Sequence, residues 1–211
     1  MNEVRTAFLD CAAQSLELVS LPVVAERWEG ASALEHFSIR GLAGHLVRAT
    51  GSVEAYLDRP EPSGPAISAA RYYAAAVDST DIGSELHVAV RAKGEAEAAE
   101  GHVALVAKLE ALTERLRGRL EIEPPRRLVR VFKDLVLSLD DYLVTRLVEQ
   151  LVHCDDLAVS VEIQTPPPPR SAIEIAFDNL VDVARVRHGD LAVLRAFARR
   201  ERDSVEALRI F

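Results

Sequence analysis

Long stretches of helix-forming residues, interrupted by proline and glycine, constrain the fold of this chain more than any other feature. Ala, Leu, Glu and Arg are abundant, whereas runs of β-branched or aromatic residues are short and aromatic residues make up only 5% of the sequence. The first group of residues favours helices and the second favours strands. With 211 residues, of which 49% are hydrophobic, the chain can bury a full core without disulfides. The sequence therefore predicts a mainly α protein.

The apolar periodicity, together with residues that favour helix caps and breaks, gives the expected positions of the helices. We expect main helices at about 2–20 and at 38–57, the second with Ser38 as its N-cap. A third should run from 79–81 to about 120, with a bend or break at Gly94 or Gly101. A fourth should cover 142–160 after a cap at Asp140 or Asp141. The run RLVRVFKDLVLSL, just before the last of these, is compatible with a short β-hairpin. The run TPPPPR predicts an extended spacer, and helices at 171–187 and 190–200 follow it, separated by Gly189.

These elements suggest a bundle followed by an appendage. We expect a four-helix bundle over 1–165, and a Pro-rich spacer with a C-terminal helical segment over 166–211 that packs on the bundle. Cys11 and Cys154 lie far apart without a metal-binding spacing, which is typical of free thiols in a reducing cytoplasm. The first residues predict no secretory signal, and no stretch is apolar enough to span a membrane. A net charge of -8 argues against nucleic acid as a partner.

One segment, TRLVEQLVHCDDLA, carries a polar stripe along a helix. Arg146, Glu149, His153 and Asp156 follow one another at spacings of three and four, so they share one face. Glu149 and His153 are suitable ligands for one metal ion, but such a pair also arises by chance, and a solvated helix face would show the same stripe. Apolar residues flank the stripe at Val148, Val152, Leu157 and Val159. These flanks favour a stripe inside a bundle.

A third possible ligand, His45, lies in the segment GLAGHLVRA of the second expected helix. Gly41, Ala49 and Ser52 are its small neighbours on the helix surface and leave room for a ligand or for a close helix. A histidine at such a position is often a core residue bonded to a carbonyl group. Bundle metal sites, however, are generally built from side chains on facing helices.

The segments RWEGASALEHFSIRGLAGHLVRA and TRLVEQLVHCDDLAVSV together resemble the N-terminal domain of mycothiol-dependent maleylpyruvate isomerase, in the DinB-like four-helix-bundle superfamily. The resemblance covers about 1–165. It implies a divalent metal, usually zinc, held by His45, Glu149 and His153. Arg146 and Asp156 also belong to the matched motif and are expected to orient these ligands or to pair between helices, with an ordinary surface ion pair as the alternative. Trp28 also matches, whereas His36, His87, His102 and His188 match nothing. Cys154 projects away from His153 and is expected in the core.

The resemblance also implies a function. A zinc ion with three protein ligands keeps one position for a small thiol, mycothiol, whose metal-bound thiolate attacks a small electrophilic substrate. Mycothiol implies an actinobacterial cytoplasm, and such bundles often form homodimers. The residues after the Pro-rich run are too few and too helical for the isomerase's further C-terminal domain, so we expect a thiol transferase or isomerase-like enzyme of unknown substrate. A hydrolase using zinc-bound water and a non-enzymatic metal-binding bundle remain alternatives.

Overall fold

The computed structural model describes residues 1–76 and 83–198. Its described helices are α1 (Glu3–Val19), α2 (Pro22–Glu26), α3 (Ile39–Leu57), α4 (Ala69–Ala76), α5 (Glu85–Glu97), α6 (His102–Ile122), a 3-10 turn (Phe132–Asp134), α7 (Leu139–Ser160), α8 (Arg170–His188) and α9 (Asp190–Ala198). Strands β1 (Leu128–Arg130) and β2 (Val136–Ser138) form an antiparallel hairpin. The predicted mainly α fold with a short hairpin is confirmed. None of the described helices is long and apolar enough to cross a membrane.

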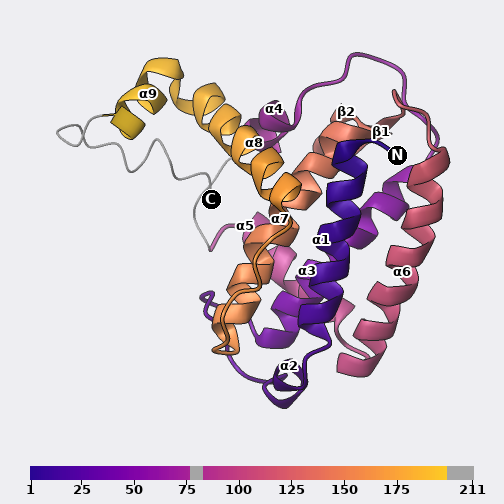
Figure 1. Cartoon of the computed structure of the whole chain (residues 1–211), viewed down its shortest axis with the longest axis vertical. Coiled ribbons are helices and arrows are strands. Elements are labelled where there is room, and N and C mark those ends of the chain that lie inside the picture. Colours follow the sequence, from indigo (N-terminus) through magenta and orange to yellow (C-terminus); the bar gives the residue numbers. More distant parts are fainter. Residues whose placement is uncertain (77–82, 199–211) are drawn as a thin grey trace.

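Four long helices, α1, α3, α6 and α7, form the bundle (Figure 1). Helices α1 and α7 run in the same direction, because Arg5 pairs with Asp140 near their starts and Ser15 contacts Cys154 near their ends. α3 runs antiparallel to α7, because Gln150 bonds Thr50 while the Tyr142 hydroxyl donates to Ser52. This antiparallel pair places the middle of α3 opposite the middle of α7, where the candidate site lies.

The C-terminal segment packs against the bundle through α8. Small apolar residues of α8, Ala172, Ala176 and Val183, belong to one buried cluster with residues of α1, α4 and α7. The extended run over 166–169 leads into α8, as the Pro-rich sequence predicts. α9 contacts mainly α8 and projects away from the bundle (Figure 1). The predicted end of this last helix at Arg200 lies outside the described residues.

The third predicted helix is two helices. The chain breaks at Gly101, whose φ of 92° is available to glycine without strain, whereas α5 continues through Gly94. The predicted start at 79–81 lies outside the described residues, and Ser84 caps α5 by accepting a hydrogen bond from the His87 N–H. The short helices α2 and α4 were not predicted, because their few residues show too little periodicity.

The predicted cap of α7 at Asp140 or Asp141 is wrong. Ser138 is the N-cap, and its hydroxyl oxygen accepts a hydrogen bond from the Asp141 N–H at 3.0 Å. The aspartates instead occupy the first turn, where negative side chains interact favourably with the helix dipole. Because β2 ends at this same Ser138, the hairpin leads directly into α7 and sets where that helix begins.

Candidate metal centre

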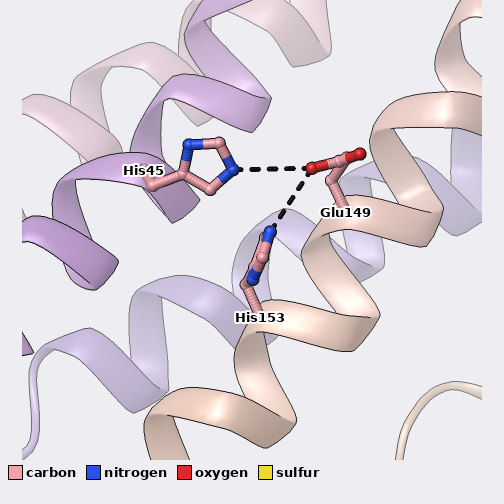
Figure 2. A group of neighbouring side chains, drawn as sticks. All are labelled: His45, Glu149 and His153. Carbon is pink, nitrogen blue, oxygen red and sulfur yellow. Dashed lines mark ion pairs between the residues drawn. The ribbon is translucent and has the colours of Figure 1, made fainter. Parts of the chain in front are cut away.

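Three side chains from two facing helices converge in the bundle. His45 comes from α3, while Glu149 and His153 lie one turn apart on α7 (Figure 2). The Nε2 atoms of His45 and His153 lie 3.5 Å and 3.4 Å from the same carboxylate oxygen, Oε2 of Glu149. One ligand atom from each residue lies within 4.8 Å of the other two, and no second group of this kind occurs among the described residues. The predicted ligands are therefore brought together.

The other oxygen of Glu149 has different neighbours. Tyr73 of α4 donates its hydroxyl to the Thr145 carbonyl at 2.9 Å and lies 3.4 Å from Glu149 Oε1. Arg146 Nη2 lies 3.9 Å from the same oxygen. Burial alone would raise the pKa of Glu149, but the hydrogen bonds from His153 and His45 and the charge of Arg146 hold that pKa well below its usual value. Glu149 is therefore a carboxylate whose Oε2 faces the imidazoles.

Asp156 fixes the orientation of His153. The His153 Nδ1–H donates to Asp156 Oδ2 at 2.9 Å, which turns Nε2 toward Glu149. Burial alone would lower the pKa of His153, but the hydrogen bonds to Asp156 and Glu149 raise it to about 9. A carboxylate on the far nitrogen is the usual partner of a metal-binding histidine. Asp156 thus has the orienting contact expected from the sequence, whereas Arg146 contacts Glu149 only at the longer distance.

His45 is held differently from His153. Its ring meets the His153 ring edge to face, with the centroids 4.6 Å apart. Burial lowers the pKa of His45, and the hydrogen bond to Glu149 only partly opposes this effect. Among the residues that the structure describes, its buried Nδ1 has no hydrogen-bond partner. The alternative of a core histidine bonded to a carbonyl group therefore does not describe His45.

The polar stripe of α7 is not a solvated helix face. Tyr142 and Thr145 are buried, and the side chains of Arg146, Glu149 and His153 are only 15%, 18% and 16% exposed. The flank on which the prediction relied is mixed, because Val148 and Leu157 are buried whereas Val152 and Val159 are exposed. The stripe lies inside the bundle as inferred, but only two of its four apolar neighbours, Val148 and Leu157, are buried with it.

The small residues around His45 accommodate a helix. A Cβ atom on Gly44 would lie 2.1 Å from the Gly94 carbonyl oxygen of α5, and one on Gly41 would lie 2.4 Å from a carboxylate oxygen of Glu95. Ala49 is buried, and Ser52 accepts a hydrogen bond from the Tyr142 hydroxyl. Of the two expectations for the room beside these small residues, a ligand or a close helix, the structure has the helix, α5. The three candidate ligands are each 14–18% exposed.

Other residues singled out from the sequence have structural surroundings. Cys154 is buried, with its thiol beside the Ser15 hydroxyl of α1, as expected of a core thiol. Trp28 packs edge to face against His102, which bonds the Val19 carbonyl. Tyr73 is the site residue that the sequence did not indicate. Its helix, α4, was not predicted, and a lone tyrosine gives no spacing signal.

The three donors fit a divalent metal by their chemistry. Two imidazole nitrogens and one carboxylate oxygen form a set common to catalytic zinc, in which the protein supplies three ligands and leaves one position for water or substrate. The contact of Asp156 with His153 supplies the orientation that such a ligand requires. The types of donor atom, their convergence at one place and the contact of Asp156 with His153 are thus those of a metal centre.

Comparison with known proteins agrees with this geometry. The family described as mycothiol maleylpyruvate isomerase N-terminal domain matches residues 8–158, which include every candidate ligand and all four bundle helices except the ends of α1 and α7. Searches of curated proteins and of solved structures found no match. The match covers most of the chain, and a DinB-like helical bundle is consistent with it. The chain belongs to the mycothiol maleylpyruvate isomerase N-terminal domain family.

Proposed function

We propose that this protein is a metal-dependent thiol transferase or isomerase-like enzyme, with zinc as the metal, mycothiol as the thiol and a small electrophile as the substrate. The family carries the link to mycothiol. The observation that carries the proposal is the convergence of His45 Nε2, His153 Nε2 and Glu149 Oε2 at one place between α3 and α7. A donor set of this kind is typical of catalytic zinc and is rare in closed structural sites, which have four protein ligands.

Within this proposal, His45, Glu149 and His153 hold the metal. When bound, the metal supplies Lewis acidity that keeps a thiol deprotonated and nucleophilic at neutral pH. Binding of a metal would displace the Nε2 proton of His153, while Asp156 would keep the other proton on Nδ1, so that Nε2 could present its lone pair to the centre. Tyr73 and Arg146 lie beside Oε1 of Glu149 and leave Oε2 directed at the imidazoles.

The reaction that follows is the formation of a bond between the thiol sulfur and an electrophilic carbon. The thiol would lose its proton to solvent. In a transfer, the bond from the carbon to its leaving group breaks and the leaving group departs with the electron pair. In an addition, the π bond of the electrophile breaks and the adjacent carbon takes up a proton from solvent. Because the candidate ligands are each only 14–18% exposed, the bundle excludes most water from this place. Partial exclusion of water strengthens electrostatic interactions within a site.

The test is the zinc-dependent conjugation of mycothiol to a chlorodinitrobenzene electrophile, followed by absorbance. We expect zinc-loaded native protein to exceed the rate without protein, and Glu149→Gln and His153→Ala to lose that excess. His36→Asn is the matched control, because His36 is exposed and has a φ of 67° that asparagine tolerates. Zinc-loaded protein without any excess rate toward a panel of electrophiles would contradict the enzyme proposal. Turnover of an ester or amide without thiol would indicate a hydrolase instead.

A further inference from the structure

Helix α8 is connected to the candidate metal centre through two side chains. Arg187, in the last turn of α8, donates a hydrogen bond from Nη2 to the main-chain carbonyl oxygen of Tyr73 at 3.1 Å. The hydroxyl oxygen of the same Tyr73 lies 3.4 Å from Oε1 of Glu149. A residue of the C-terminal segment is therefore linked to a candidate metal ligand through one tyrosine of α4.

Two cations contact the C-terminal half of α4. Besides the bond from Arg187 to Tyr73, the Lys133 ammonium group, from the turn of the hairpin, donates to the Ala75 carbonyl oxygen at 3.0 Å. Both carbonyl groups lie in the second half of α4 (Ala69–Ala76). Positive side chains interact favourably with the C-terminal end of a helix. The hairpin and α8 thus hold this end of α4 from two elements.

The remainder of α4 is held between α7 and α8. At its start, the Ala69 N–H donates to Oδ1 of Asp141, in the first turn of α7, at 3.1 Å. Along its length α4 packs mainly on α8 (Figure 1). Tyr73 shares a buried cluster there with Ala176 and Val183. The position of α4, and of Tyr73 on it, therefore depends on α8.

Tyr73 in turn restricts the carboxylate of Glu149. The tyrosine side chain is 1% exposed, and its hydroxyl donates to the Thr145 carbonyl oxygen at 2.9 Å, which fixes the hydroxyl oxygen in place. Because this oxygen lies 3.4 Å from Oε1, it limits how far the carboxylate can turn. The other oxygen, Oε2, is the one that faces His45 and His153. The place of Tyr73 thus decides which oxygen is offered to a metal.

We propose that Tyr73 and Arg187 are positioning residues of the candidate metal centre, and that Arg187 acts through Tyr73 to orient Glu149 for metal binding. The inference rests on the metal site of the proposed function and is independent of the reaction. α8 follows the residues that match the family, 8–158, so this support of the centre comes from outside the match.

The test compares zinc affinities by competition with a chromophoric chelator, under conditions in which circular dichroism shows each variant folded. Tyr73→Phe removes only the hydroxyl and should bind zinc about tenfold more weakly, as is typical when a contact that orients a ligand is lost. Arg187→Met keeps the apolar stem but removes the donors, and should weaken zinc binding several-fold. Arg187→Lys restores a cation for the Tyr73 carbonyl and should recover part of that loss. Arg170→Ala is the matched control, because Arg170 is an exposed arginine of the same helix that pairs with Glu174.

A variant that combines Tyr73→Phe with Arg187→Met tests whether Arg187 acts through Tyr73. We expect the combined variant to bind zinc as tightly as Tyr73→Phe alone, because residues that act through one contact do not contribute additively. Additive losses, or native zinc affinity in Arg187→Met, would overturn the inference. Zinc binding with this pattern of losses but without turnover of any electrophile would refute the proposed reaction alone.

Discussion

Asp156 makes the contact that would orient His153 as a metal ligand. It accepts a hydrogen bond from His153 Nδ1 at 2.9 Å, which fixes the tautomer and the ring orientation. Replacing such a partner typically weakens metal binding by about 10–100-fold. We predict that Asp156→Asn lowers zinc affinity by about tenfold, measured by competition with a chromophoric chelator. Asp155→Asn, at the exposed neighbouring residue, should leave the affinity unchanged. Equal affinities in the two variants would contradict the orienting role.

Spacing and resemblance together were sufficient to predict which three side chains converge, but not which residues surround them. The four-residue spacing of Glu149 and His153 fixes their common face, and the resemblance supplied His45. The contact of Tyr73 could not be foreseen, because it depends on how α4 folds back over α7.

Helices α3 and α5 cross in close contact beside His45. A Cβ atom on Gly94 would lie 2.4 Å from the Gly41 carbonyl oxygen, so α5 would have to move away from α3. We predict that Gly94→Ala lowers the free energy of unfolding by about 1–3 kcal/mol, measured by urea denaturation. Gly118→Ala in α6 meets no atom within 4 Å and should raise stability by about 0.5–1 kcal/mol through helix propensity. Stabilisation by both variants would contradict the close crossing.

The same two helices show why element boundaries were only partly predictable. Gly94 and Gly101 are equivalent as sequence signals, yet α5 continues through the first and the chain turns at the second. The difference lies in tertiary packing, because Gly94 meets Gly41 and Gly44 whereas Gly101 faces open space. The predicted position of the α7 cap was wrong for a similar reason, because strand β2 ends at Ser138 and that residue is therefore the N-cap.

For the whole molecule, the candidate metal centre joins α3 to α7, two long helices of the bundle. A ligand that binds only the folded chain raises the free energy of unfolding. The increase grows with the logarithm of the ratio of free ligand concentration to dissociation constant. We predict that saturating zinc raises the midpoint of thermal unfolding of the native protein by several degrees, followed by circular dichroism, and leaves Glu149→Gln unaffected. An equal rise in both proteins would mean that zinc binds elsewhere.

The central claim is that His45, Glu149 and His153 hold a divalent metal. The most direct measurement is metal content by mass spectrometry on purified native protein, on His153→Ala and on the control His36→Asn. We predict close to one equivalent of zinc in the native protein and in His36→Asn, and a loss of that zinc in His153→Ala. A native protein without metal after reconstitution with zinc, or a His153→Ala variant that retains it, would contradict the claim.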